Sequence, residues 1–423
     1  MIHRVTAQMS NDVVRDERKR AYLNPTGSDR ALKSPVPSAA IEGARRYRID
    51  RLRRRMARHD CGALLLYDPS NIRYAFDSVN MAVWTMHNAA RYALVLSDGA
   101  GIIFEFPGCE HVNRGLTAVT EVRDARTWTH FINGTNASKQ VELWADEIQD
   151  VLREHGAGPR IAVDRLDSMG VDALRRRALE VNEGQGIAEE ARCIKSADEL
   201  TLMRWTVRVC EAGMARVYEA SEPGRTEREL WAELHFENAR SGGEWLETKL
   251  LTAGRRTNPW FQECSDYAVA SGEMISLDTD LIGPYGYCAD VSRSWTCGHT
   301  KMTPLQRSLY LTALEQINHN LSLLRPGLEF AEFNERSWRI PEKHIPYRYP
   351  GAIHGVGVTD EWPLVHLYPD FSKNYAGMFE ENMVVTVESL IAEAGSESIK
   401  LETQVVITAT GAQRLDSFPW ELA

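Results

Sequence analysis

Residues 274–295 read MISLDTDLIGPYGYCADVSRSW and carry three aspartates around a glycine-containing reversal. Asp278 and Asp280 are two apart in a strand-like run, so their side chains should project from one face of a sheet. The stretch 283–286 suits a turn, and a hairpin there would bring Asp290 beside the first two. Buried, unpaired carboxylates are costly. The cluster therefore indicates either a bound cation or a solvated strand face.

Further potential ligands follow in the last third of the chain. His354 lies in AIHGVG, where small neighbours let a ligand approach the backbone closely. Glu388 ends the run MVVTVES, and Glu402 lies in SIKLETQVVIT, with AEAGSES as a turn between them. Carboxylates and imidazole suit Mn, Fe, Co or Zn, and carboxylates bridge paired ions. The predicted ligands of two divalent metal ions are Asp278, Asp280, Asp290, His354, Glu388 and Glu402.

The composition bounds the class of protein. A chain of 423 residues exceeds one ordinary hydrophobic core, so two domains are expected. A net charge of −10 argues against nucleic acid as a partner, since phosphate contacts need a basic surface. No stretch is apolar enough to span a membrane. Seven scattered cysteines without a C-x-x-C pair suit reduced thiols, so a cytoplasmic location is expected.

Three segments are predicted along the chain. Residues 1–40 are polar and proline-containing and suggest an extended arm. Residues 41–190 alternate helical and strand-like runs, as in a small α/β domain. Residues 191–423 begin with a long helix and continue with strand-like runs and further helices, which predicts an α+β domain with an antiparallel sheet. Thr226 and Glu229 form a capping-box pattern at one helix start.

The order of these motifs resembles that of the creatinase/aminopeptidase, or pita-bread, metalloenzymes, which include prolidase and methionine aminopeptidase. The resemblance implies a small creatinase-like N-terminal domain, a pita-bread catalytic domain, and metal ligation by Asp278, Asp290, His354, Glu388 and Glu402. It covers the chain from about residue 41 to its end. The matching stretches are IKSADELTLMR (194–204), GYCADVSRS (286–294), RPGLEF (325–330), HGVG (354–357), ENMVVTVES (381–389) and IKLET (399–403).

The chain departs from the peptidases of that family at informative positions. Asp280 replaces a glycine, which suggests a sixth ligand or a carboxylate that shapes the site. A catalytic histidine of the peptidases is absent near Phe261, and Asp360 stands where a second one would lie. Lys400 replaces the arginine of the family's R-x-E stretch. Metal binding is therefore expected to be retained, and peptide hydrolysis is not.

A carboxylate beside metal ions suits proton abstraction from a substrate whose own carboxylate binds the metals. Asp360 is the predicted general base; neighbouring Glu361 is left open as an alternative, as is a role for Asp360 in supporting His354. Aromatic residues near the motifs, Trp260, Tyr349 and Trp362, are candidates for a cage around a cationic group, although most aromatic residues serve the core.

The extra aspartate, the missing histidines and HGVGVTDEWP look like the dimethylsulfoniopropionate lyases of the DddP type. This resemblance implies β-elimination of a small zwitterionic substrate to acrylate and dimethyl sulfide, a homodimer, iron at the metal site, and Tyr349 near the sulfonium group. The main alternative is a hydrolase of Xaa-Pro dipeptides or creatine-like substrates, which would need the absent histidines. A non-catalytic binding module is a third, weaker alternative, because the expected ligands are all present.

Overall fold

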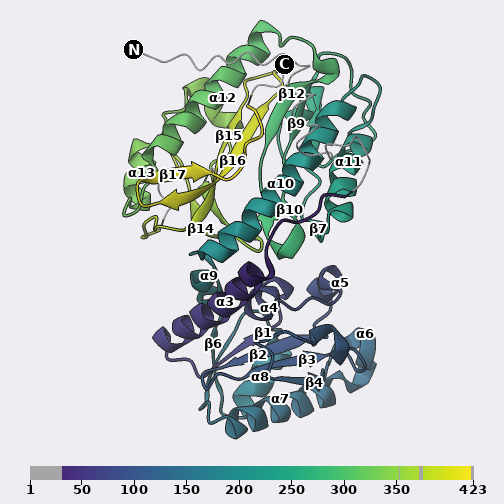
Figure 1. The fold of residues 1–423 in the computed structure, drawn as a ribbon, viewed down its shortest axis with the longest axis vertical. Coiled ribbons are helices and arrows are strands. Elements are labelled where there is room, and N and C mark those ends of the chain that lie inside the picture. The colour runs from purple at the N-terminus through teal and green to yellow at the C-terminus, as the bar shows by residue number, and fades with distance from the viewer. Residues whose placement is uncertain (1–30, 352, 371–374, 421–423) are drawn as a thin grey trace. The chain divides into compact units, whose positions relative to one another are not determined.

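The computed structural model describes residues 31–351, 353–370 and 375–420. The chain forms two compact units, one spanning Pro37–Asp198 and the other formed by the described residues before Pro37 together with those from Glu199 onward (Figure 1). Residues 1–30 of the predicted arm lie outside the described residues. None of the helices in the described part is long and apolar enough to cross a membrane.

The N-terminal unit is a six-stranded mixed sheet, ordered β4-β3-β2-β1-β5-β6. Its central strand β1 has the sequence ALLL, and all four residues are buried, as expected where helices cover both faces. The strands are β1 (Ala63–Leu66), β2 (Tyr92–Leu96), β3 (Gly101–Glu105), β4 (Glu121–Asp124), β5 (Arg160–Val163) and β6 (Glu180–Glu183). The helices are α3 (Ser38–Arg58), α4 (Pro69–Phe76), α5 (Ala82–His87), α6 (His130–Asn133), α7 (Ala137–Glu154), α8 (Ser168–Arg176) and α9 (Gln185–Arg192).

The second unit packs helices around antiparallel strands. Helix α12 packs on β15 and β16, and α11 packs on β8, so the strands lie between helices in Figure 1. The helices are α10 (Ala197–Ala220), α11 (Glu227–Arg240), α12 (Pro304–Leu323) and α13 (Phe330–Arg336). The strands are β7 (Trp245–Leu246), β8 (Leu251–Ala253), β9 (Met274–Leu277), β10 (Leu281–Ile282), β11 (Cys288–Ala289), β12 (Arg293–Thr296), β13 (Ile353–Val356), β14 (Asp360–Val365), β15 (Val384–Ile391), β16 (Ile399–Thr408) and β17 (Gly411–Arg414).

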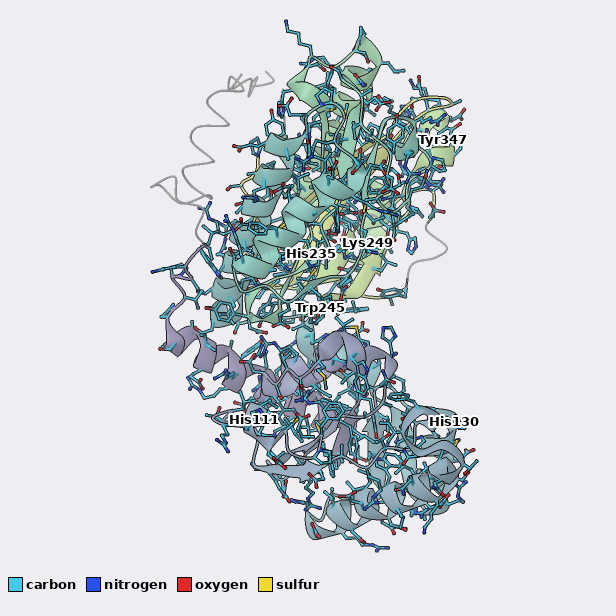
Figure 2. All side chains as sticks on the ribbon, turned by 90° about the vertical axis from the view of Figure 1, so that its right-hand side faces the viewer. His111, His130, His235, Trp245, Lys249 and Tyr347 are labelled. Atoms are coloured by element: carbon cyan, nitrogen blue, oxygen red, sulfur yellow. The ribbon has the colours of Figure 1, made fainter. Side chains whose placement is uncertain are left out.

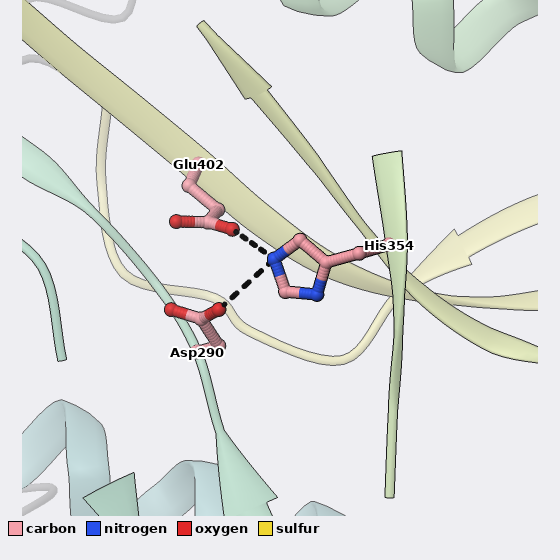
Figure 3. A group of neighbouring side chains, drawn as sticks. All are labelled: Asp290, His354 and Glu402. Atoms are coloured by element: carbon pink, nitrogen blue, oxygen red, sulfur yellow. Dashed lines mark ion pairs between the residues drawn. The ribbon is translucent and has the colours of Figure 1, made fainter. Parts of the chain in front are cut away.

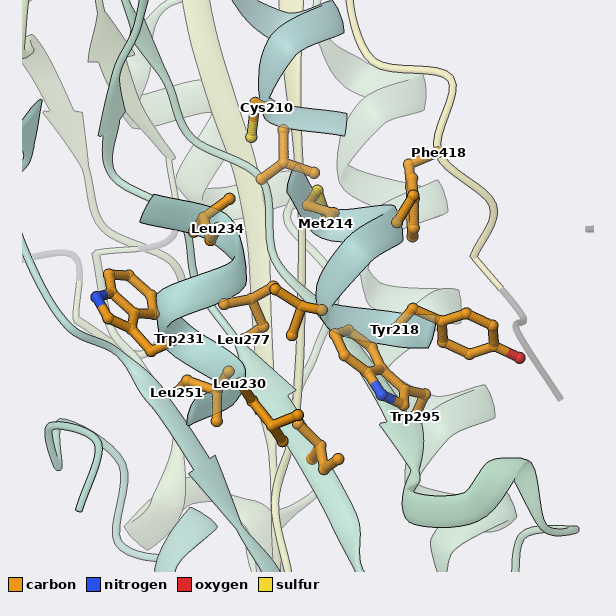
Figure 4. Packing of buried hydrophobic residues seen from close by; sticks show 14 of the residues in the cluster. Cys210, Met214, Tyr218, Leu230, Trp231, Leu234, Leu251, Leu277, Trp295 and Phe418 are labelled. Atoms are coloured by element: carbon orange, nitrogen blue, oxygen red, sulfur yellow. The ribbon is translucent and has the colours of Figure 1, made fainter. Parts of the chain in front are cut away.

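The hydrophobic core of this unit anchors the strand that leads into the aspartate cluster. Tyr218 on α10 and Trp295 on β12 meet edge to face, with ring centroids 5.8 Å apart. Leu277, the last residue of β9, is fully buried in the same core (Figure 4). The predicted capping box is present at α11. The Thr226 hydroxyl accepts a hydrogen bond from the backbone N–H of Glu229, and the Glu229 carboxylate accepts one from the backbone N–H of Thr226.

The local structure around Asp278 differs from the expectation of one continuous strand. Strand β9 ends at Leu277, and β10 begins only at Leu281. Asp280 has φ of 33°, a left-handed conformation that ends strand geometry and that aspartate tolerates better than most residues. The antiparallel hairpin itself forms, because β10 pairs with β11 with Leu281 opposite Ala289. Asp278 and Asp280 therefore approach the site from a bend rather than from one strand face.

Candidate metal centre

The sheet ordered β14-β13-β15-β16-β17 carries the predicted base, three of the predicted metal ligands and Trp362. His354 lies on β13, Asp360 begins β14, and Glu388 and Glu402 lie within β15 and β16. Gly355 allows β14 to approach β13 closely, since a Cβ on this residue would lie 2.4 Å from the carbonyl oxygen of Trp362.

One buried group of potential ligands centres on His354. Its Nε2 lies 3.4 Å from Oδ2 of Asp290 and 3.6 Å from Oε1 of Glu402 (Figure 3). Ligand atoms of these three residues lie within 4.8 Å of one another. The same Nε2 lies 3.6 Å from Oε1 of Glu388. An imidazole nitrogen and carboxylate oxygens thus converge on one point.

A second group shares Asp290 with the first. Asp280, Asp290 and Asp360 each place a carboxylate oxygen within 4.8 Å of the others. The side chain of Asp360 remains 48% exposed, and its Oδ1 lies 3.7 Å from Nδ1 of His354. The second group is therefore buried on the Asp290 side and open to solvent on the Asp360 side, which is the side that a substrate would reach.

Asp278 and Glu388 join the cluster through a buried lysine. The ammonium group of Lys400 lies 3.3 Å from Oδ2 of Asp278, 2.6 Å from Oε2 of Glu388 and 2.8 Å from Oε2 of Glu402. The hydroxyl of Ser292 is 2.7 Å from both Oδ1 of Asp278 and Oε2 of Glu402, so it can donate to either. All six predicted ligands are thus brought into one cluster.

Crowding of buried carboxylates dominates the electrostatics. Burial and the negative charge of Glu402 raise the pKa of Glu388 to about 8. Burial and Glu402 likewise raise the pKa of Asp290 well above its ordinary value. Burial alone would raise the pKa of Glu402, but Lys400 and His354 outweigh it and lower that pKa. Burial would lower the pKa of His354, but the surrounding carboxylates raise it. Additional positive charge would therefore stabilise the ionised form of these carboxylates.

The residues present fit a bound metal. Oδ1 of Asp290, Oε1 of Glu388 and Oε1 of Glu402 are buried and have no hydrogen-bond partner among the described residues. Unsatisfied buried carboxylate oxygens are expensive in any folded protein. A cation between them would satisfy all three at once, and the mixture of carboxylate and imidazole donors suits a first-row divalent ion.

The structure separates the two carboxylates left open as candidates for the base. Neighbouring residues of β14 project to opposite faces. Asp360 turns toward His354, whereas the Glu361 carboxylate is buried against Gly357, where an added Cβ would lie 2.4 Å from its Oε2. Asp360 therefore borders the acidic cluster, while the Glu361 carboxylate lies beside Gly357.

The three aromatic candidates fall into two separate groups. Trp260 and Tyr349 pack in one apolar cluster with Leu390, which lies two residues after Glu388 on β15 and so shares its face. The Tyr349 ring centroid lies 6.0 Å from the ammonium nitrogen of Lys400, which places the ring beside the acidic cluster. Trp362 instead meets the ring of Phe330, 5.8 Å away, in a separate aromatic group.

Several supporting residues were not predicted from the sequence. Thr248, which donates a hydrogen bond to Asp280, comes from a distant segment and gave no sequence signal. Ser292 lies two residues after Asp290, in the segment between β11 and β12. His111, His130 and His235 are exposed and lie on other elements of the described structure (Figure 2).

Comparison with known proteins defines the class. Residues 48–194 match the creatinase/prolidase N-terminal domain, and residues 201–409 match metallopeptidase family M24. The fold is similar to those of an Xaa-Pro dipeptidase from Bacillus anthracis (TM-score 0.71, 19% identity, 90% of this chain and 99% of that one) and a prolidase from Pyrococcus horikoshii (TM-score 0.71, 18% identity, 89% and 99%). The predicted α+β pita-bread fold with a creatinase-like N-terminal domain is confirmed.

Two curated relatives are much more similar. The chain is 40% identical over 394 residues to the dimethylsulfoniopropionate lyase DddP of Roseovarius nubinhibens, covering 90% of this chain and 88% of the relative. It is 38% identical over 396 residues to the DddP of Roseobacter denitrificans, with the same coverage. The chain belongs to the DddP family of this metalloenzyme superfamily. An Xaa-Pro dipeptidase from Pyrococcus furiosus is only 24% identical over 241 residues.

Proposed function

We propose that this protein is a metal-dependent carbon–sulfur lyase that cleaves dimethylsulfoniopropionate to acrylate and dimethyl sulfide by β-elimination. The identity of 38–40% over 90% of the chain with two lyases named for this reaction carries the proposal. The altered site supports it, because Asp360 stands at the solvent-facing edge of a cluster that keeps its metal-binding donors.

Asp360 is the general base of the proposed reaction. Its carboxylate removes a proton from the carbon next to the substrate carboxylate. The C–H electron pair forms the new carbon–carbon double bond as the carbon–sulfur bond breaks, and the electron pair of that bond leaves with dimethyl sulfide. Partial burial raises the pKa of Asp360 and nearby His354 opposes the shift, while the negative charges of Glu402 and Glu361 add to it.

Two divalent metal ions, iron being the favoured element, would be held by Asp278, Asp280, Asp290, His354, Glu388 and Glu402. When bound, they supply positive charge that neutralises the substrate carboxylate and stabilises the charge developing beside it. The buried oxygens without hydrogen-bond partners support this assignment.

The aromatic residues would receive the sulfonium end of the substrate. Tyr349 borders the acidic cluster, and Trp260 packs in the same apolar group. A cation over an aromatic face gains about 0.5–2 kcal/mol, depending on desolvation. Trp362 would contribute only from the neighbouring aromatic group around Phe330, so it is the weakest of the three.

The assembly and location belong to the same proposal. The protein would act as a homodimer in the cytoplasm, where a small zwitterionic substrate is its only required partner. The lack of disulfides supports a reducing compartment, since no disulfide forms among the seven cysteines, all of which lie in the described residues: Cys61, Cys109, Cys193, Cys210, Cys264, Cys288 and Cys297.

The test measures dimethyl sulfide in the headspace above metal-reconstituted protein given dimethylsulfoniopropionate. Wild type should release the gas, Asp360→Asn should not while still binding metal, and the matched variant Glu361→Gln should remain active. An Xaa-Pro dipeptide is run in parallel. Dipeptide hydrolysis without gas release would favour the hydrolase and overturn the lyase.

A further inference from the structure

Lys400 is a buried cation inside the proposed metal centre. Only 1% of the residue is exposed, and its ammonium group contacts the carboxylates of Asp278, Glu388 and Glu402 at 2.6–3.3 Å. An ammonium group has three N–H donors and no acceptor, so it cannot itself bind a metal. The three N–H donors of Lys400 do match in number the three carboxylates that it contacts. The role of Lys400 must therefore lie in what it does to these carboxylates.

The contacts divide the oxygens of the two glutamates. Oε2 of Glu388 and Oε2 of Glu402 accept hydrogen bonds from Lys400, at 2.6 and 2.8 Å. Oε1 of each glutamate instead lies 3.6 Å from Nε2 of His354, and neither has a hydrogen-bond partner in the described part of the chain. Each glutamate thus has one oxygen held by the lysine and one directed toward the histidine.

The third carboxylate, that of Asp278, is held at both of its oxygens. Lys400 lies 3.3 Å from Oδ2 of Asp278, and the Ser292 hydroxyl lies 2.7 Å from Oδ1. Lys400 reaches all three because it stands two residues before Glu402 on β16, and residues two apart in a strand share a face. A single side chain therefore orients three of the six proposed ligands.

We propose that Lys400 is a positioning residue for the metal centre: it holds one oxygen of Asp278, Glu388 and Glu402 so that the metal-facing oxygens are set before the ions bind. This inference rests on the metal-binding part of the proposed function. Groups that orient metal ligands typically contribute 10- to 100-fold to metal affinity. Charge repulsion acts in the opposite direction, because an ammonium group beside a cation site weakens cation binding. The two effects predict opposite outcomes when the charge is removed.

The experiment titrates metal-free protein with Mn²⁺ by isothermal calorimetry, without any substrate. Lys400→Met, which removes the donors, should bind Mn²⁺ about 10- to 100-fold more weakly than wild type. Lys400→Arg, which restores a buried cationic donor, should recover affinity to within a few-fold. Lys343→Met is the matched control, because Lys343 is 62% exposed and pairs only with Glu393 away from the cluster among the described residues; its affinity should equal that of wild type.

Equal or tighter Mn²⁺ binding by Lys400→Met would overturn the proposal. Circular dichroism of the metal-free variants shows whether they fold. If Lys400→Met does not fold, Ser292→Ala takes its place, because that hydroxyl contacts Oδ1 of Asp278 and Oε2 of Glu402 without carrying charge. It should bind Mn²⁺ several-fold more weakly, and unchanged affinity would count against the idea. Failure of wild type to bind Mn²⁺ would instead reject the metal centre itself.

Discussion

Glu388 and Glu402 stand directly opposite each other on β15 and β16. Side chains in such a cross-strand pair share a face at about 4.5–5.5 Å between Cβ atoms, and like charges there destabilise the sheet. Here both carboxylates are almost completely buried, and the described structure offers them Lys400 on one side and His354 on the other. Positive charge beside this pair therefore stabilises it, and a bound metal ion would add to the charge that Lys400 supplies.

Removal of metal should lower the stability of the second unit. Binding to the folded state stabilises it by about 2.7 kcal/mol at a free ligand concentration 100-fold above Kd. Calorimetric melting with Mn²⁺ or with a chelator should show this difference. Asp290→Asn, which alters the residue shared by both candidate groups, should lose most of the metal-dependent shift. Identical melting curves with and without metal would contradict the expectation.

The sequence predicted which residues would gather but not how they are held. Motif order and strand alternation identified Asp290, His354 and Glu402 as candidate ligands. The structure brings these three residues together. Their role as metal ligands stays a prediction. The bend at Asp280 was missed because its positive φ depends on tertiary contacts, including the hydrogen bond from Thr248. Such contacts join segments far apart in the chain and leave no local pattern.

Phe261 should contribute to recognition of the sulfonium group. It has φ of 67°, which is strained for a bulky residue, and it is 62% exposed with its ring 5.4 Å from that of Tyr349. Strained residues of this kind concentrate at functional sites. Phe261→Leu should raise KM about 2- to 30-fold, the range corresponding to 0.5–2 kcal/mol, with little change in kcat. Phe236→Leu, at another exposed phenylalanine on α11, is the control. An unchanged KM would remove Phe261 from the substrate site.

The N-terminal unit should lose stability in acid through Asp77. Its carboxylate lies 2.6 Å from Arg45, 3.2 Å from Arg48 and 3.1 Å from Arg73. Burial would raise the pKa of Asp77, but the three arginines outweigh it and hold that pKa below 3.8. Because the folded pKa lies below the unfolded one, the stabilisation is complete above pH 3.8 and is lost as pH falls through the folded value.

Replacement of Asp77 tests that assignment. Asp77→Asn removes a largely buried carboxylate that contacts Arg45, Arg48 and Arg73, and should cost about 3–5 kcal/mol at pH 7. Urea unfolding at pH 7 and pH 3, followed in the N-terminal unit, measures both effects. The variant should lack the acid-dependent loss that Asp77 gives to wild type. Equal pH dependence in the two proteins would show that other carboxylates govern acid unfolding.

The reach of the carboxylate at residue 360 should control the elimination step. Asp360→Asn removes the base and should lower kcat by about 10²- to 10⁴-fold. Asp360→Glu keeps the carboxylate but moves it by about one methylene, and a displacement of about 1 Å can cost about 10²-fold. Both variants should bind Mn²⁺ close to wild-type affinity if Asp360 acts on substrate rather than as a required ligand. Substrate deuterated at the carbon beside the carboxylate should react more slowly in wild type, because the C–H bond breaks in the step that Asp360 assists. Full activity of Asp360→Asn would exclude Asp360 as the general base. Loss of Mn²⁺ binding in both variants would instead indicate that Asp360 is a metal ligand or supports one.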